Sequence, residues 1–372
     1  MAKTVLLCAN TAWCLYQFRR GVIKAFLDQG IKVIALTAPD EVTPLLKRMG
    51  CEVIDLNISV RGVNPLADLA MLWQMVRLYK KCQPDLIFHY TVKPNIYGSI
   101  AARLAGIPSL SIATGLGFSF INESWVTKVV RQLYKVAFRY PEQVWFLNPD
   151  DRKEFLDFRL VDESRTRLLP GEGVDTSHFL PQPNSGKEGE FRFLLIARLL
   201  WDKGVGEYVA AAREIRKSYP NARFQMLGVI GASNPSKIGE AQVDAWVREG
   251  VVEYLGATSD VRPFIASAQC VVLPSYREGV SRILMEAASM ERPLVATNVP
   301  GCREVIIAGT TGFLCEPRNV ADLTKKLKKM LLLSDEQRKA MAKAGREFVI
   351  NNLDEKIVIR HYIEVLRKFG IV

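Results

Sequence analysis

Short, almost continuously apolar segments recur along this chain, and segments with helical periodicity separate them. Strands that are apolar on both faces are typical of parallel sheets, because helices cover both sides of such sheets. In the first half of the chain the predicted strands are Val5–Ala9, Lys32–Leu36, Val53–Leu56, Leu86–His89, Leu110–Ala113 and Val144–Leu147. The alternation therefore predicts the α/β class, with a doubly wound, Rossmann-like sheet.

The alternation is interrupted once and then begins again. Residues 180–190 are rich in proline, glycine and charge, which is typical of an interdomain linker. Further strands are predicted at Phe193–Ala197, Phe224–Leu227, Val251–Leu255, Cys270–Leu273 and Leu294–Thr297. A chain of 372 residues also exceeds the usual span of one hydrophobic core.

We therefore predict two Rossmann-like domains that face a central cleft. The first domain covers 1–180, a linker covers 181–190, and the second domain covers 191–352. Residues 353–372 form a C-terminal helix that is a candidate to pack back onto the first domain. Ligands of open α/β sheets bind at the carboxyl ends of the strands, so the cleft is the expected site.

The composition argues against a metal site and a membrane span. The seven cysteines include no CxxC pair, and the three histidines lie far apart in sequence. We expect no metal and no cofactor. The longest uncharged stretch, Leu104–Asn122, contains Gly106 and Pro108 and predicts strand and loop rather than a spanning helix. A soluble or peripheral protein is expected.

The charge is concentrated in the first half of the chain. The net charge is +11, and residues 1–140 hold 17 Lys and Arg against 8 Asp and Glu. Such a surface indicates nucleic acid, anionic lipid or a phosphorylated substrate as partner, or has no specific role. Trp125–Tyr140 is a basic amphipathic helix, suited either to an anionic membrane surface or to the core. Nucleic-acid binding predicts a set of stacking aromatic residues among the basic residues and a recognisable motif; no convincing set is found, so no nucleic acid is expected.

Two groups of residues in the second half suit a nucleotide diphosphate. Arg198 and Lys203 follow the first strand of that half, and two cations on such a loop can hold a diphosphate. Alone, this pair is a weak signal, because loop cations are usually only solvated.

The second group is the segment Glu278–Glu286. Gly279, Val280 and Ser281 lie at the start of a helix that is expected to begin near Val280, and the free amides of such a start can face an anion. Glu286 lies in an apolar run, where a carboxylate needs a hydrogen-bonding partner such as a ribose diol. The alternative is a glutamate on the helix surface.

Together these residues resemble the retaining glycosyltransferases with the two-Rossmann, GT-B architecture. The hallmark is the Glu-x7-Glu segment from Glu278 to Glu286, accompanied by Gly171–Asp175, the Arg198 and Lys203 pair, and Pro300-Gly301. The resemblance covers the whole chain and is strongest over 165–320. One difference is that the glycine pair which many relatives carry after their first strand is absent here, where the loop reads Asn10–Arg19.

The resemblance implies a role for each matching residue. Arg198 and Lys203 would hold the donor diphosphate and stabilise the leaving group, which removes the need for a divalent ion. Glu286 would bind the ribose, and Glu278 would contact the transferred sugar, with the amides of Gly279, Val280 and Ser281 near sugar and phosphates. Retention would follow from front-face attack assisted by the leaving phosphate.

In the first half, two loops are expected to line the cleft. His89 would orient the sugar or the acceptor, and Lys93 and Asn95 belong to the same His89–Asn95 loop. Thr114 and Gly115 form a second loop at a strand end. A lone histidine at a strand end is more often structural, so the role of His89 depends on the resemblance.

The loops of the first half look most like those of a bacterial subgroup that extends undecaprenyl-diphosphate-linked sugars. The implied reaction transfers an N-acetylhexosamine or hexose from a UDP-sugar to a lipid-linked saccharide. The implied location is the cytoplasmic face of the membrane, with peripheral attachment. A nucleotide-sugar 2-epimerase with the same two-domain layout is the alternative enzyme, and a basic nucleic-acid-binding protein is the non-enzymatic alternative.

Overall fold

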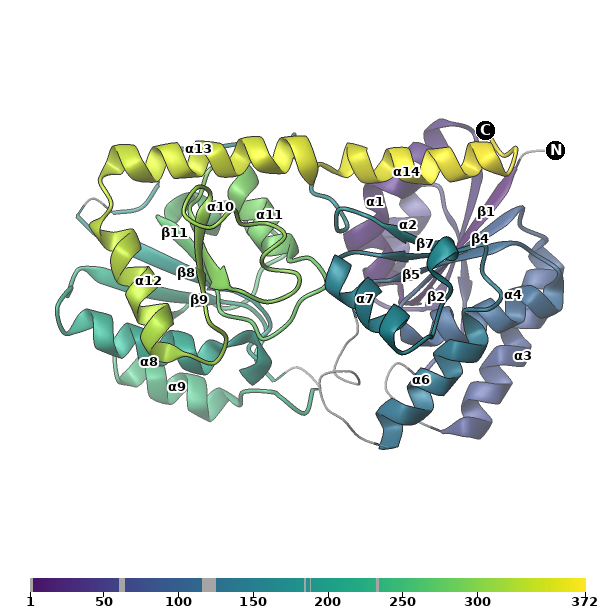
Figure 1. Cartoon of the computed structure of the whole chain (residues 1–372), viewed down its shortest axis with the longest axis horizontal. Helices are drawn as coiled ribbons and strands as arrows, with labels where there is room; N and C mark the ends of the chain where they lie inside the picture. The colour runs from purple at the N-terminus through teal and green to yellow at the C-terminus, as the bar shows by residue number, and fades with distance from the viewer. Residues whose placement is uncertain (1–2, 60–63, 116–124, 184, 188, 232–233) are drawn as a thin grey trace. The chain divides into compact units, whose positions relative to one another are not determined.

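The computed structural model describes residues 3–59, 64–115, 125–183, 185–187, 189–231 and 234–372 (Figure 1). The chain divides into two compact units. The first consists of Met1–Glu172 and Lys356–Val372, and the second of Gly173–Glu355. The boundary thus lies at Glu172 rather than at residue 180, and residues 173–190 belong to the second unit.

The first unit is built on a seven-stranded parallel sheet with the order β3-β2-β1-β4-β5-β6-β7. Its strands are β1 (Thr4–Thr11), β2 (Lys32–Ala38), β3 (Glu52–Asp55), β4 (Leu86–Tyr90), β5 (Ser109–Ala113), β6 (Gln143–Phe146) and β7 (Thr166–Leu168). Its helical segments are α1 (Ala12–Asp28), α2 (Thr43–Arg48), α3 (Pro65–Cys82), the π-helix η1 (Pro94–Gly98), α4 (Ser99–Ala105), α6 (Trp125–Ala137), α7 (Pro149–Asp157), the 3-10 helix η2 (Glu163–Arg165) and α14 (Glu355–Lys368). Strands β4 and β5 are buried throughout, and β1 is buried over residues 5–9, as their continuous apolar character predicts.

The second unit has a six-stranded parallel sheet with the order β10-β9-β8-β11-β12-β13. Its strands are β8 (Phe191–Ile196), β9 (Ala222–Leu227), β10 (Glu253–Tyr254), β11 (Cys270–Leu273), β12 (Leu294–Thr297) and β13 (Gly312–Cys315). Its helical segments are the 3-10 helix η3 (Trp201–Lys203), α8 (Val205–Arg216), α9 (Glu240–Arg248), α10 (Arg262–Ser267), α11 (Arg282–Ser289), α12 (Val320–Leu332) and α13 (Asp335–Asn352). The prediction of two doubly wound, Rossmann-like sheets is confirmed.

One segment departs from the sequence prediction at a site of interest. Asn10–Arg19 was expected to be a loop, but helix α1 begins at Ala12. The side chain of Thr11 caps this helix by accepting a hydrogen bond from the amide of Cys14 at 3.2 Å. The first strand therefore passes directly into a helix, and no loop is available there to approach a ligand.

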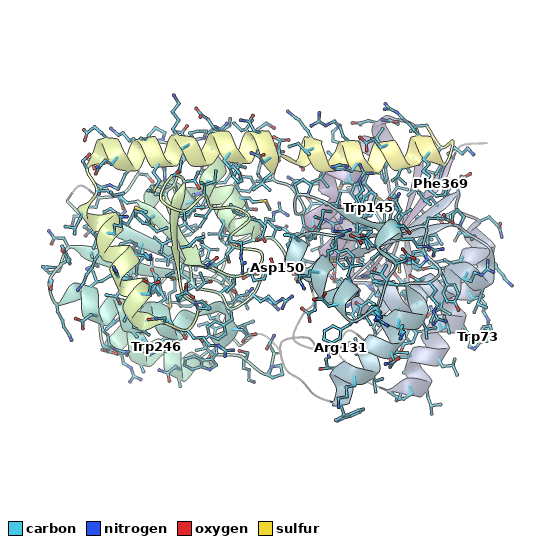
Figure 2. All side chains as sticks on the ribbon, viewed as in Figure 1. Trp73, Arg131, Trp145, Asp150, Trp246 and Phe369 are labelled. Atoms are coloured by element: carbon cyan, nitrogen blue, oxygen red, sulfur yellow. The ribbon has the colours of Figure 1, made fainter. Side chains whose placement is uncertain are left out.

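The aromatic core of the first unit is completed by the end of the chain. Tyr362 on α14 is fully buried, with its ring centroid 5.0 Å from those of both Phe88 and Trp145. Its hydroxyl accepts a hydrogen bond from Tyr90 at 3.1 Å. Trp145 is labelled beneath α14 in Figure 2. Helix α14 thus covers strands β4 and β6 on the face that α1 covers elsewhere through Phe26.

Among the described residues, no helix combines the length and the apolar character needed to cross a bilayer.

We predict that Tyr362→Ala destabilises the first unit by about 3–5 kcal/mol, the range for removing a large buried aromatic side chain. Tyr362→Phe keeps the ring, loses only the Tyr90 hydrogen bond, and should cost about 1 kcal/mol. Hydrogen exchange of the β4 and β6 amides measures both changes, with the β8 amides of the second unit as internal reference. Unchanged exchange in Tyr362→Ala would show that α14 does not stabilise this sheet.

Candidate functional site

The second sheet reverses its strand order between β8 and β11, and three loops meet at the carboxyl ends next to this point. They are the loop after β8 (197–204), the loop after β11 (274–281) and the loop after β12 (298–304). A reversal of strand order leaves a crevice above the strands, because the connections on either side lead away in opposite directions. The predicted donor residues Arg198, Lys203 and Glu278 lie on two of these loops.

Two glycines let the three loops come into contact. Gly204 has φ +69°, and a Cβ atom there would lie 2.0 Å from the carbonyl oxygen of Pro274. Gly301 has φ +84°, and a Cβ atom there would lie 2.4 Å from the backbone of Glu278. Only glycine permits both the positive φ and the close approach. Each of these positions therefore joins one loop to the loop after β11.

Backbone hydrogen bonds fix the same arrangement. The amide of Glu278 donates to the carbonyl of Pro300 at 3.0 Å, and the amide of Ser281 donates to the carbonyl of Gly301 at 2.7 Å. The amide of Tyr276 donates to the carbonyl of Asp202 at 2.9 Å. The loop that carries Glu278 is thus held on both sides by backbone contacts, and the position of its carboxylate follows from them.

Lys203 and Glu278 form an ion pair in this loop cluster. The distance from Nζ of Lys203 to Oε1 of Glu278 is 2.5 Å, and each side chain is less than one-fifth exposed. Arg198 is exposed at the start of the loop after β8 and, within the described part of the chain, its guanidinium has no hydrogen-bond or ion-pair partner. Of these two predicted donor cations, only Lys203 is paired with a carboxylate within the described part of the chain.

Glu286 is a buried carboxylate in the second turn of α11. Its side chain is 7% exposed, and it accepts a hydrogen bond from Nε of Arg282 at 2.7 Å. Burial raises the pKa of Glu286, and Arg282 only partly offsets this effect. The structure therefore excludes the alternative of a surface glutamate, which supports the interpretation from the apolar neighbours of Glu286. Arg282 was not identified from the sequence, although its spacing of four residues is that of a helical ion pair.

The segment between the two glutamates caps the helix. Ser281 precedes α11 with an extended backbone, φ −70° and ψ 109°, and is buried, as is Val280. Gly279 is half-buried. Helix α11 begins at Arg282 rather than near Val280, so its first amides follow Ser281. The free amides of a helix start favour an anion at this position.

The first unit places its predicted residues differently. His89 has no exposed surface, its Nε2 lies 3.0 Å from the hydroxyl of Tyr79, and its ring packs under Gly98. Burial lowers the pKa of His89 to about 3, so the imidazole is neutral at physiological pH. This corrects the expectation that His89 faces a ligand: as the fourth residue of a central strand, it points into the core.

Lys93 and Asn95 also have structural partners. Nζ of Lys93 lies 2.5 Å from Oδ1 of Asp68, whose second oxygen accepts a hydrogen bond from Tyr97. Asn95 is buried and donates to the carbonyl of Ile112 at 2.9 Å. Both residues thus hold η1 against α3 and β5.

Two further positions lie at strand ends of the first sheet. Thr114 and Gly115 follow β5 and are half-buried, and the remainder of that loop lies outside the described residues. Thr91 follows β4 and has φ +68°, an uncommon conformation for a β-branched residue. It lies where the first sheet reverses its strand order, between β1 and β4. Sequence reasoning gave no signal for this conformation.

The motif Gly171–Asp175 contributes an internal ion pair rather than a ligand contact. Glu172 accepts a hydrogen bond from NH2 of Arg19 at 2.8 Å, and both side chains are buried. The Arg19 guanidinium also lies over the ring of Tyr90, 4.5 Å from its centroid. Asp175 accepts hydrogen bonds from the amides of Ser177 and His178. The ion pair therefore ties the end of the Met1–Glu172 segment to α1.

No group of three or more His, Cys, Asp or Glu side chains that would suit a metal ion is found among the described residues.

Two family models match the chain. The model described as Glycosyl transferase 4-like matches residues 4–148, and the model described as Glycosyl transferases group 1 matches residues 178–348. The second match includes all the residues of the loop cluster.

Characterised relatives match over most of their length. The chain is 29% identical to N,N'-diacetylbacillosaminyl-diphospho-undecaprenol alpha-1,3-N-acetylgalactosaminyltransferase of Campylobacter jejuni, with 94% of this chain and 95% of that protein covered. It is 26% identical to UDP-Gal:alpha-D-GlcNAc-diphosphoundecaprenol alpha-1,3-galactosyltransferase of Escherichia coli, with 79% and 78% covered.

Solved structures share the fold. HepE of Anabaena in complex with UDP has a TM-score of 0.81 at 18% identity, with 99% of this chain and 100% of that chain covered. Sucrose-phosphate synthase of Thermosynechococcus elongatus has a TM-score of 0.82 at 18% identity, with 99% of each chain covered.

We predict that Gly301→Ala weakens binding of a nucleoside diphosphate about tenfold or more, because a Cβ atom there displaces the backbone of Glu278. Gly309→Ala is the matched control: Gly309 has the same φ of +84°, but nothing lies within 4 Å of its Cβ position. Both variants carry the strain of a positive φ, about 1 kcal/mol. Isothermal calorimetry compares them, and equal affinities in the two variants would contradict the proposed coupling between these loops.

Proposed function

Because this chain belongs to the group 1 glycosyltransferases with the GT-B fold, we propose that its second unit binds a UDP-sugar at the loop cluster around Lys203, Glu278 and Glu286. The observation that carries this proposal is the buried carboxylate of Glu286, which lies in the helix that follows the cluster. A buried carboxylate is retained at a cost, and a ribose diol supplies the two hydroxyl donors that would offset it.

The diphosphate is assigned to Arg198 and Lys203. Arg198 is exposed at the carboxyl end of β8, and Lys203 is already paired with a carboxylate. In the proposed complex the diphosphate takes the place of Glu278 as the partner of Lys203. Glu278 is then released toward the hydroxyl groups of the transferred sugar. The two cations stabilise the charge that develops on the leaving diphosphate.

The proposed reaction transfers a hexose or N-acetylhexosamine with retention. The bond between the anomeric carbon and the diphosphate oxygen breaks, and a bond to an acceptor hydroxyl oxygen forms on the same face. The acceptor proton passes to the leaving phosphate, so UDP departs and no enzyme nucleophile is needed. The names of both characterised relatives specify an alpha linkage, which is the outcome of retention when the donor sugar is alpha-linked.

The proposed acceptor is a saccharide linked to undecaprenyl diphosphate, in the assembly of a bacterial surface polysaccharide or a protein-linked glycan. The support is that both relatives are named for diphospho-undecaprenol acceptors, one of them over 94% of this chain. Such an acceptor is anchored in a membrane, so we place the reaction at the cytoplasmic membrane face, with the protein attached peripherally. The positive charge of the first 140 residues suits that location.

We predict that the protein binds UDP and that Glu286→Gln weakens this binding roughly 10- to 150-fold, the equivalent of about 1.5–3 kcal/mol for a hydrogen bond to a charged group. Calorimetry with UDP, GDP and ADP measures the effect and the base preference. Glu347→Gln, an exposed glutamate on α13, is the matched control. Wild-type affinity in Glu286→Gln would remove the ribose assignment.

The same variant separates binding from folding. The pKa of Glu286 is raised above its ordinary value of 4.5 by burial. Its contribution to stability is therefore full below pH 4.5 and is lost as the pH rises through the folded-state pKa. At neutral pH the glutamine variant should unfold no more readily than the wild type, so a loss of UDP binding there reports on the site.

We predict that Lys203→Ala lowers kcat about a hundredfold, because a donor that stabilises the leaving group is lost. The control is Lys217→Ala, which removes an exposed lysine that also pairs with a glutamate, Glu214. Sugar transfer to a synthetic polyprenyl-diphosphate-linked saccharide measures both. Wild-type turnover should persist in EDTA, since cations of the protein neutralise the diphosphate. Complete loss on chelation, or release of an epimerised sugar without acceptor, would contradict the proposed reaction.

A further inference from the structure

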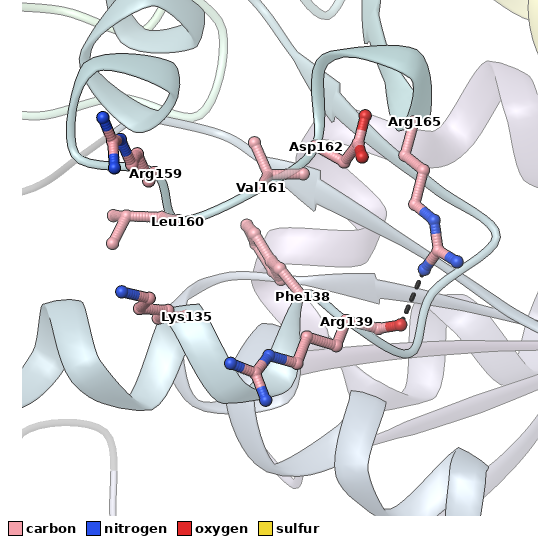
Figure 3. A pocket seen from close by; sticks show the side chains of 8 residues that line it. All are labelled: Lys135, Phe138, Arg139, Arg159, Leu160, Val161, Asp162 and Arg165. Atoms are coloured by element: carbon pink, nitrogen blue, oxygen red, sulfur yellow. Dashed lines mark hydrogen bonds between the residues drawn. The ribbon is translucent and has the colours of Figure 1, made fainter.

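A basic pocket lies on the first unit, built from the end of α6 and the segment 159–165 (Figure 3). Its volume is about 350 Å³, and its lining comprises four cationic, three apolar and one acidic residue. The lining residues are Lys135, Phe138, Arg139, Arg159, Leu160, Val161, Asp162 and Arg165. None of them takes part in the donor site, which lies in the second unit.

The walls of this pocket are held by the fold. Phe138 and Leu160 are buried and belong to the aromatic cluster of α6 and α7. NH1 of Arg165 donates to the carbonyl of Arg139 at 2.6 Å, the dashed line in Figure 3, and so joins the two segments that form the pocket. The cations therefore lie on a fixed base.

The charge of this pocket is not balanced by the protein. Within the described part of the chain, the side chains of Lys135, Arg139 and Arg159 have no hydrogen-bond or ion-pair partner. The one carboxylate, Asp162, accepts hydrogen bonds from the amide and the hydroxyl of Ser164. Three unpaired cations and the partly engaged guanidinium of Arg165 around one small cavity favour a compact anion such as a phosphoryl group.

Exposed apolar side chains lie next to the pocket on α6. Thr127, Tyr134 and Ala137 form the buried face of this helix, whereas Val129 and Val136 are 48% and 45% exposed. Phe158 is also exposed, and its ring lies under the guanidinium of Arg131 (Figure 2). The guanidinium carbon is 3.7 Å from the ring centroid.

A second hollow of mostly apolar lining runs along this helix. Val129, Val136 and Phe158 line it, together with Lys128 and Arg131. Val136 and Phe158 of this hollow are sequence neighbours of Lys135 and Arg159, which line the basic pocket. An anion site bordered by exposed apolar side chains matches an amphiphile with a phosphoryl head and a hydrocarbon tail.

We propose that the pocket of Lys135, Arg139, Arg159 and Arg165 binds the phosphoryl headgroup of an anionic membrane phospholipid, with the exposed apolar side chains of α6 contacting the acyl region. This proposal rests on the proposed function for its membrane setting. It assigns membrane binding to one pocket rather than to the overall positive charge of the first unit. Removing two cations of this pocket should therefore weaken vesicle binding far more than removing two other cations of the same unit.

The test compares Arg139→Gln/Arg159→Gln with Lys47→Gln/Arg48→Gln, which removes two exposed cations next to each other on α2. Both double variants lose the same charge in the full-length protein. Sedimentation with vesicles of equal parts phosphatidylglycerol and phosphatidylcholine measures binding, and pure phosphatidylcholine vesicles give the background. We expect the pocket variant to bind at least tenfold more weakly than the wild type and the α2 variant to stay within about twofold.

Three results would overturn the proposal. Equal losses in both double variants would indicate a diffuse charge effect. Binding that requires polyprenyl diphosphate in phosphatidylcholine vesicles, and not phosphatidylglycerol, would assign the pocket to the acceptor. Wild-type vesicle binding by the pocket variant would leave the pocket without a role. UDP affinity, measured in the same preparations, should be unchanged in both variants, so failure of the donor site and failure of the lipid site are distinguished.

Discussion

The geometry of the proposed donor site depends on the absence of a side chain at two glycines. At Gly204 and Gly301 the backbone of one loop lies against the backbone of the loop after β11, at distances that no Cβ atom would permit. These contacts set the position of Glu278 next to Lys203 and fix the start of α11. The electrostatic features of the site therefore follow from backbone packing, which any other residue at Gly301 would disturb.

The site also contains a charge distribution that is unfavourable without a ligand. Glu286 is buried, and its ion pair with Arg282 only partly offsets the rise of its pKa on burial. Arg198 is exposed and has no partner among the described residues. Among the described residues, neither charge is fully compensated in the free protein at neutral pH. In the proposed complex a ribose diol and a diphosphate would offset both charges, and this is how binding sites are commonly organised in proteins of marginal stability.

The sequence was informative where a feature is local and less so where it depends on tertiary packing. Apolar runs identified the two parallel sheets, and the apolar neighbours of Glu286 indicated its burial. The orientation of His89 could not be predicted, because residues on both faces of a central parallel strand are buried. The partners of Lys93 and Asn95, namely Asp68 and the Ile112 carbonyl, come from α3 and β5 and have no counterpart in local sequence. Strand β7 was not predicted, because its three residues include Arg167 and do not form an apolar run.

The most direct measurement is a crystal structure of the protein with bound UDP. The account predicts that the ribose hydroxyls donate to the carboxylate of Glu286 and that the diphosphate oxygens lie within hydrogen-bonding distance of Arg198 and Lys203. It also predicts that the Lys203–Glu278 ion pair is opened. UDP bound away from the carboxyl ends of β8 and β11, or bound there with the ion pair intact and Glu286 still held only by Arg282, would contradict the central assignment.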